Sequence, residues 1–187
     1  DINSEVIDNA EYLLIEGYLV TSKDTKDVAR HCLDVATKNN VKKIITLSDP
    51  NVINFFRENM MELLQKNFDI IFCNEQEALN ISMKDNINDA IDFLRQFSTE
   101  IIITAGGDGA YAYANNELSY VKSESITPVD LTGAGDMFLA AYIYSKLSNK
   151  DPSTSIKFAN TCSAKIIQKY GAKFDDHIIY KQLVKKL

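Results

Sequence analysis

A glycine-rich segment, DLTGAGDMF at residues 130–138, has the residue types of an anion site beside a carboxylate. Gly133 and Gly135 let the backbone approach a ligand closely, and the apolar pattern that follows predicts a helix. A helix N-terminus directs unpaired N–H groups and a positive dipole end at one point, where phosphate or a developing negative charge is stabilised. Asp136 in its first turn could take a proton from an attacking hydroxyl, a role worth about 10²–10⁴-fold in rate. An ordinary glycine loop before a helix has the same local sequence, so both interpretations stay open.

A second candidate is the segment CNEQEALNI at 73–81, where a predicted strand runs into a predicted helix. Asn74 and Glu77 are three residues apart and share a face of that helix. Their amide and carboxylate could serve Mg²⁺ with its retained waters, or a phosphate network. The same spacing fits a capping box, with Asn74 as N-cap and Glu77 closing the box.

A third candidate is ITAGGDGAY at 103–111, whose chemistry-bearing residues are Thr104, Gly106, Gly107 and Gly109. A turn explains the glycines, because Asp-Gly is a favoured turn pair. The alternative is a backbone surface that packs against a planar base or a ribose. The segment matches neither GxGxxG nor GxxxxGK[ST], so neither a Rossmann dinucleotide site nor a P-loop is predicted.

These loops lie within an alternation of short apolar strands and amphipathic helices. Strands are predicted at 10–18, 42–50, the start of 68–81 and within 100–121; helices are predicted at 22–40, 51–67, 87–97, 134–147, about 152–169 and about 175–187. Such alternation predicts an α/β fold with a mostly parallel sheet covered by helices on both faces. Ligands of such sheets bind outside the carboxyl ends of the strands, where the three loops fall. The Asn-Asn pairs of the chain are interpreted as compositional drift.

Composition narrows the class of protein. The chain has 187 residues, which suits one domain, and a net charge of -6 with scattered lysines, so neither nucleic acid nor an anionic membrane is an expected partner. Three cysteines without a CxxC pair predict neither a disulfide framework nor a zinc site and favour the cytoplasm. Only His31 and His177 are present, so histidine-based catalysis has little support. Because the chain starts at Asp1 without Met or a leader, we expect that an upstream part has been removed.

Together, the three loops resemble the ribokinase-like (PfkB) sugar and nucleoside kinases over essentially the whole chain. DLTGAGDMFLAAYI is similar to that family's C-terminal signature. The resemblance implies that Asp136 is the catalytic base. It also implies that the N–H groups around Gly133, Ala134 and Gly135 form the anion hole for the transferred phosphoryl group.

Other elements of the family follow in the same order. NEQE resembles an Asn-x-x-Glu element that handles Mg²⁺ and phosphate, and TAGGDG resembles a Thr-x-Gly-x-x-Gly nucleotide loop. FANTCSAKIIQKYGA, at 158–172, is similar to the closing segment. The implied nucleotide-binding residues are Asn74, Thr104, Gly106, Gly109 and Asn160. Glu77 would contact Mg²⁺ through water, and Asp130, Thr132 and Gly171 could bind a monovalent cation such as K⁺.

By this resemblance, the fold is ribokinase-like and residues 1–187 are the nucleotide-binding and catalytic-base half of a kinase domain. The expected activity is ATP-dependent phosphorylation of a hydroxymethyl group. IEGYLV and DIIFCNEQEALNI are most like adenosine kinases, which favours a nucleoside; a ribokinase- or fructokinase-type sugar kinase is the alternative.

Two departures limit the resemblance. Leu131 replaces a small or β-branched residue beside the implied cation loop. The glycine-rich substrate signature and the small β lid of the family are missing, so the chain alone could be an inactive nucleotide-binding fragment. The intact protein could be a homodimer, since family dimers often use the lid.

Overall fold

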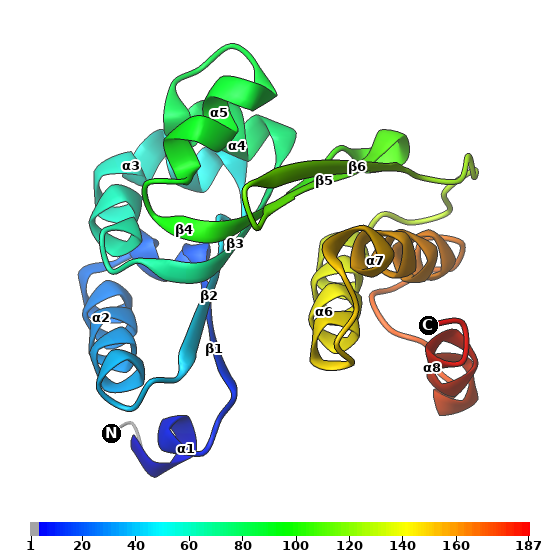
Figure 1. The fold of residues 1–187 in the computed structure, drawn as a ribbon, viewed down its shortest axis with the longest axis horizontal. Helices are drawn as coiled ribbons and strands as arrows, with labels where there is room; N and C mark the ends of the chain where they lie inside the picture. The colour runs from blue at the N-terminus through cyan, green and yellow to red at the C-terminus, as the bar shows by residue number, and fades with distance from the viewer. Residues whose placement is uncertain (1–3) are drawn as a thin grey trace. The chain divides into compact units, whose positions relative to one another are not determined.

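The computed structural model describes residues 4–187, which form two compact units. The first unit comprises the chain up to Ile103 together with Tyr113–Asn116, and the second comprises Thr104–Ala112 and Glu117–Leu187. Six strands form one sheet in the order β1-β2-β3-β4-β5-β6 (Figure 1). The strands are β1 (Tyr12–Glu16), β2 (Lys42–Thr46), β3 (Phe68–Asn74), β4 (Ser98–Thr104), β5 (Gly109–Ala114) and β6 (Glu117–Lys122).

The first unit is built on parallel strands. Strand β2 pairs in parallel with β1 and β3, with Ile44 opposite Leu14 and Ile70. The neighbouring residues Ile44 and Ile45 point to opposite faces of the sheet, and both are buried. Burial on both faces explains why the central strands read as continuous apolar runs in the sequence.

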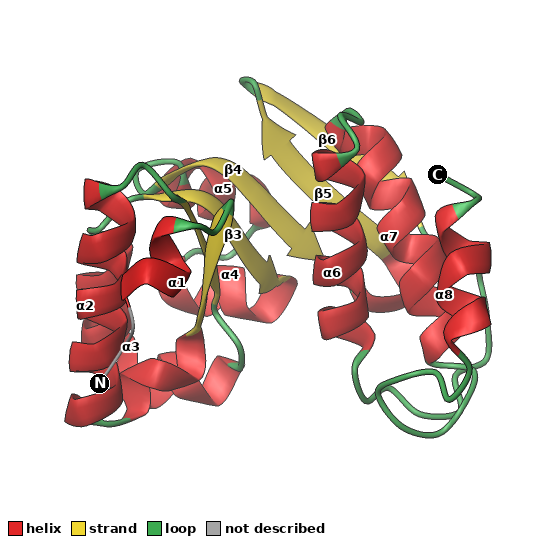
Figure 2. Cartoon of the chain, turned by 90° about the horizontal axis from the view of Figure 1, so that it is seen from below, coloured by secondary structure: helices red, strands yellow, loops and turns green. Residues whose placement is uncertain are grey.

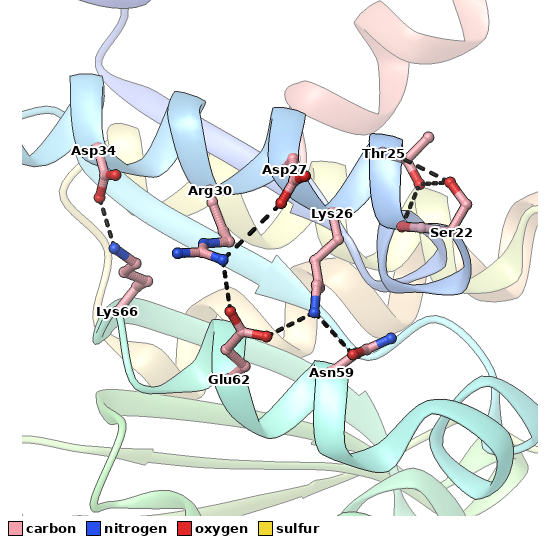
Figure 3. Close-up of polar contacts among 9 residues, drawn as sticks. All are labelled: Ser22, Thr25, Lys26, Asp27, Arg30, Asp34, Asn59, Glu62 and Lys66. Atoms are coloured by element: carbon pink, nitrogen blue, oxygen red, sulfur yellow. Dashed lines mark hydrogen bonds and ion pairs between the residues drawn. The ribbon is translucent and has the colours of Figure 1, made fainter.

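The helices of the first unit are α1 (Ser4–Asp8), α2 (Lys23–Lys38), α3 (Pro50–Leu64), α4 (Glu75–Ser82) and α5 (Ile87–Leu94). Figure 3 shows polar contacts that join α2 to α3 and to Lys66 just beyond it. Lys26 and Arg30 both contact the carboxylate of Glu62, at 2.7 and 2.9 Å. The Lys26 hydrogen bond and the cationic neighbours lower the pKa of Glu62. The Lys26 side chain is 15% exposed and that of Arg30 is 44% exposed, so solvent weakens the Arg30–Glu62 pair more than the Lys26–Glu62 pair.

The second unit contains α6 (Ala134–Leu147), α7 (Pro152–Ile166) and α8 (His177–Val184). Helices α6 and α7 lie side by side (Figures 1 and 2). Their buried residues include Phe138 and Tyr142 from α6 and Ile156 and Ala159 from α7. No helix within residues 4–187 combines the length and apolar character needed to cross a bilayer.

The structure corrects several sequence-based boundaries. Residues 17–21 form a short 3₁₀ helix where a strand was expected to continue, and Pro50 begins α3 where it was expected to end a strand. Proline suits the first helical position because its missing N–H would be unpaired there. The short helix α1 was not predicted; its Ile7 packs with Ala36 and Val41.

The interpretation of the Asn-Asn pairs as drift was wrong. Asn115 and Asn116 have φ of 54° and 64° and form the two-residue turn between β5 and β6. Asn40, with φ of 57°, follows the end of α2. Asparagine tolerates the left-handed backbone that these positions need, so each pair has a structural role.

Candidate active site

Helix α6 of the second unit begins without a side-chain cap. Its N-cap residue, Gly133, has φ of 79° and offers no side-chain acceptor. By contrast, side-chain oxygens cap α2, α3, α4, α5, α7 and α8, from Ser22, Asp49, Asn74, Asn86, Asp151 and Asp176. The start of α6 is therefore left able to receive an acceptor from outside the chain.

The individual N–H groups at this helix start differ. The Ala134 N–H donates to the Leu131 carbonyl at 3.2 Å, so one of the predicted anion-hole donors is already engaged. The N–H groups of Gly135 and Asp136 have no hydrogen-bond acceptor among residues 4–187. Gly135 is also open: a Cβ placed on it would meet no atom within 4 Å. Gly135 is thus the predicted donor that best fits an incoming anion.

Asp136 lies in the first turn of α6. Its side chain is exposed, and its carboxylate accepts no hydrogen bond from another described residue. A carboxylate in this position gains from the helix dipole in its ionised form. It is therefore available to a substrate proton beside the Gly135 N–H.

A cavity of about 410 Å³ lies within the second unit, against the start of α6. It brings together six of the residues predicted from the sequence: Thr104, Gly106, Gly109, Ala134, Gly135 and Asn160. Gly133, Asp136 and the three predicted monovalent-cation residues do not line it. Much of its wall is apolar, with Ile126, Pro128, Phe138 and Ile167.

Sequence reasoning missed part of this wall. Residues 123–126 and Pro128, which contribute to it, lie in an irregular stretch that has neither periodicity nor glycine to mark it. Ser163 also lines the cavity and was not singled out. Its spacing of one helical turn after Asn160 was the only available signal.

The loop at 104–109 is a tight turn and a cavity wall at once. The Ala105 N–H bonds the Gly109 carbonyl at 2.8 Å, and the Asp108 N–H bonds the Ala105 carbonyl at 3.0 Å. Gly109 is required by structure, because its φ is 131° and a Cβ would come within 2.2 Å of the Val121 carbonyl oxygen. Gly106, with φ of 56°, faces open space instead. The turn interpretation is confirmed, and packing of this loop against a base or a ribose stays a prediction.

Asn160 is buried, and its Nδ2 donates to the Val121 carbonyl at 3.2 Å. This bond fixes the side-chain amide between α7 and β6. No described residue donates to the Asn160 side-chain oxygen, so this oxygen is available as an acceptor at the cavity wall.

Asp130 is hydrogen-bonded to Thr132 and Gly171, the other two residues predicted for a monovalent cation. Its Oδ1 accepts from the Thr132 N–H and hydroxyl, at 2.9 and 2.7 Å, and its Oδ2 accepts from the Gly171 N–H at 2.9 Å. These bonds, that from Gly171 first, lower the pKa of Asp130. Both carboxylate oxygens already have donors, and Gly171 presents an N–H where a cation needs an oxygen. In this arrangement the residues do not fit a bound cation.

Asn74 and Glu77 belong to the first unit and form a complete capping box. The Asn74 side chain accepts from the Glu77 N–H at 2.8 Å, and Glu77 accepts from the Asn74 N–H at 3.0 Å and from its Nδ2 at 2.7 Å. Burial raises the pKa of Glu77 to about 7, against the lowering effect of the Asn74 N–H and with a smaller rise from Asp49. The side-chain oxygens of Asn74 and Glu77 fit a hard cation held through water. Direct coordination of the cation would compete with the hydrogen bonds of the capping box.

Comparisons with known proteins agree with the resemblance seen in the sequence. Residues 1–178 match the family model described as pfkB family carbohydrate kinase. A ribokinase of Staphylococcus aureus (strain COL) is 32% identical over 115 residues, which cover 56% of this chain and 37% of the relative.

Among solved structures, adenosine kinase from Sinorhizobium meliloti has a TM-score of 0.90 at 24% identity, covering 99% of this chain and 57% of that one. A putative ribokinase II from E. coli in complex with ATP and Mg²⁺ has a TM-score of 0.87 at 22% identity, covering 100% and 62%. The predicted α/β fold is confirmed. The chain spans roughly half the length of these relatives.

Proposed function

The chain belongs to the pfkB family of carbohydrate kinases, and from this premise we propose that its protein transfers the γ-phosphate of ATP to a hydroxymethyl group of a nucleoside or a sugar. Residues 1–187 would supply the nucleotide-binding and catalytic-base half of the kinase domain. One observation carries the proposal: the uncapped start of α6 adjoins a cavity of about 410 Å³ and carries a free carboxylate on its first turn.

In the proposed reaction, Asp136 takes the proton of the acceptor hydroxyl as its oxygen attacks the γ-phosphorus. The bond from that phosphorus to the β,γ-bridging oxygen breaks, and ADP leaves. The Gly135 N–H and the positive end of α6 stabilise the charge on the moving phosphoryl group. Positioning and electrostatics carry most of such a transfer, which is why few polar side chains are needed.

The cavity is the proposed seat of the adenosine of ATP. Its apolar wall suits a planar base, the open Gly106 turn allows the backbone close to a ribose, and Asn160 offers a fixed acceptor. Thr104 lies at the end of β4, where the cavity begins.

Mg²⁺, when bound with ATP, neutralises phosphate charge. Glu77 is proposed to hold it through water, with Asn74 contributing to the phosphate network. No role for K⁺ is built on Asp130, since its oxygens are already engaged.

The substrate class is proposed from the relatives. Both a ribokinase and an adenosine kinase resemble this chain. The adenosine-like assignment rests on the sequences IEGYLV at 15–20 and DIIFCNEQEALNI at 69–81. We place the protein in the cytoplasm, in keeping with its three free cysteines, and expect a homodimer with small-molecule partners rather than nucleic acid or membrane.

Replacing Asp136 by Asn in the full-length protein tests the mechanism. Phosphoryl transfer should fall by about 10²–10⁴-fold, while calorimetry shows ADP binding close to that of the unchanged protein. Near-normal turnover would remove Asp136 from the role of base.

A second candidate is nucleotide binding without turnover, which the chain's share of its relatives' length favours. Calorimetry of this chain with ADP, beside a turnover assay with adenosine and ribose, separates the two. Binding without turnover favours the second candidate, and absence of both contradicts each.

A further inference from the structure

A serine of α7 is hydrogen-bonded to the first turn of α6. The Ser163 hydroxyl donates to the Ala134 carbonyl oxygen at 3.0 Å. Ala134 is the first residue of α6, and Ser163 lines the cavity together with Ala134 and Gly135. Ser163 is thus next to the proposed phosphoryl site without belonging to the glycine-rich segment.

This bond acts on the donor that the site needs. The Ala134 carbonyl and the Gly135 N–H belong to the same planar peptide group. A hydrogen bond to the carbonyl polarises that group and strengthens its N–H as a donor. It also fixes the plane, and therefore the direction in which the Gly135 N–H points. The Gly135 N–H is one of the two at this helix start that have no acceptor within residues 4–187.

Other contacts to the glycine-rich segment and the residues before it also come from the end of α7 and the residues that follow. The Val129 N–H donates to the Ile167 carbonyl at 2.7 Å, ahead of the glycine-rich segment. Gly133 lies against Ala172, so closely that a Cβ on Gly133 would be 2.6 Å from the Ala172 Cβ. These contacts fix the segment that precedes α6, whereas Ser163 contacts the peptide group that carries the Gly135 N–H.

We propose that Ser163 is a positioning residue for phosphoryl transfer, which orients and polarises the Ala134–Gly135 peptide group so that its N–H meets the transferred group. The inference rests on the proposed function. It assigns Ser163 no contact with the nucleotide and no proton transfer. Loss of the Ser163 hydroxyl should therefore weaken the binding of a phosphoryl mimic, which carries the most negative charge, and leave the binding of a neutral nucleoside unchanged.

The matched control is a second serine bond between the same two helices. The Ser155 hydroxyl donates to the Ser145 hydroxyl at 2.9 Å, and both residues are buried. Ser145 lies in the last turn of α6, far along the helix from Gly135. Ser155→Ala therefore removes a bond between α6 and α7 without touching the Ala134–Gly135 peptide group.

The test compares Ser163→Ala, Ser163→Thr and Ser155→Ala in this chain by calorimetry. The probes are adenosine, and ADP with Mg²⁺ and aluminium fluoride as the mimic of the transferred group. Ser163→Ala should bind the mimic about two- to tenfold more weakly, the range of one neutral hydrogen bond. Its adenosine affinity should not change. Ser163→Thr, which keeps a hydroxyl, should restore most of the loss, and Ser155→Ala should bind both probes normally.

A second readout is the ¹⁵N resonance of Gly135. Loss of the bond to the preceding carbonyl should shift it upfield in Ser163→Ala and leave it in place in Ser155→Ala. An unchanged Gly135 resonance, or equal weakening by Ser155→Ala, would overturn the proposal, as would weaker adenosine binding. If the unchanged chain fails to bind ADP, the proposed function fails, while the Gly135 resonance still decides whether Ser163 polarises that peptide group.

Discussion

Helices α4 and α6 both follow segments that the sequence marked for phosphate chemistry, yet they begin in opposite ways. Helix α4 starts at Asn74 with a capping box in which Asn74 and Glu77 satisfy each other. Helix α6 starts at Gly133 with a left-handed backbone and no side-chain acceptor. At α4 the helix start is capped without a ligand. At α6, N–H groups are left that a ligand could accept from. The expectation that both segments follow strand ends is wrong for the second, because Asn74 ends β3 whereas β6 ends at Lys122, well before the glycine-rich segment.

The difference also separates two ways of using charge. At α4 a carboxylate is buried, which raises the pKa of Glu77 to about 7. At α6 the carboxylate of Asp136 is exposed on the first turn. A buried, internally bonded acid suits a structural or water-mediated role, whereas an exposed one can exchange a proton with a substrate.

The largest effect is expected from Gly133→Ala. Its φ of 79° disfavours a side chain, and the new Cβ would be 2.6 Å from the Ala172 Cβ. Backbone strain and overpacking together should lower the free energy of unfolding by about 2–4 kcal/mol. Urea denaturation measures it. A loss below about 0.5 kcal/mol would show that this loop adjusts freely.

Glu77→Gln is expected to change how stability depends on pH. The folded-state pKa of Glu77, about 7, lies above its usual value of 4.5, so the unchanged chain loses stability as pH rises from 4.5 to 7. Glutamine can still close a capping box but does not titrate. Between pH 4.5 and 8 the free energy of unfolding of the variant should therefore fall by about 1–3 kcal/mol less than that of the unchanged chain. Thermal unfolding in EDTA checks this, and parallel curves would contradict it.

Asn74→Ala should remove the N-cap of α4 and cost about 0.5–2 kcal/mol. Asn74→Ser, which keeps an oxygen acceptor at the N-cap, should retain most of that stability. Denaturation of both variants separates the cap from any ligand role. If Asn74→Ser loses as much as Asn74→Ala, the amide matters beyond capping.

The smallest effect on stability, with the sharpest functional meaning, is expected from Gly135→Ala. Its Cβ would meet open space, and alanine favours a helix over glycine by up to about 1 kcal/mol. The unliganded chain should therefore be as stable or slightly more stable. Binding of ADP with aluminium fluoride should weaken, because the Cβ narrows the approach to the N–H. Unchanged binding would mean that the anion does not come close to Gly135.

The sequence predicted those features of α4 and α6 that depend on the spacing of apolar residues and on the positions of glycines. The range 134–147 predicted for the helix after the glycine-rich segment is that of α6, because its apolar pattern and its glycines mark both the body and the start. The capping box at Asn74 was one of two interpretations, and the structure contains it. Whether the pair also serves Mg²⁺ stays a prediction.

What the sequence could not supply depends on the shape of a loop or on contacts between distant residues. The wall at Ser123 to Pro128 has no periodic pattern, so only the fold places it at the cavity. That the Ala134 N–H is engaged by Leu131 follows from the shape of the loop. The hydrogen bond from the Gly171 N–H to Asp130 likewise depends on the return of the chain 41 residues later.

The segment from Ile167 to Ala172 has a practical consequence for protein engineering. It accepts the Val129 N–H, bonds Asp130 through Gly171 and packs Ala172 against Gly133. A protease nick or an inserted tag within these residues should therefore disable the glycine-rich segment from a distance in sequence. An insertion after α8, which ends at Val184, would interrupt none of these contacts.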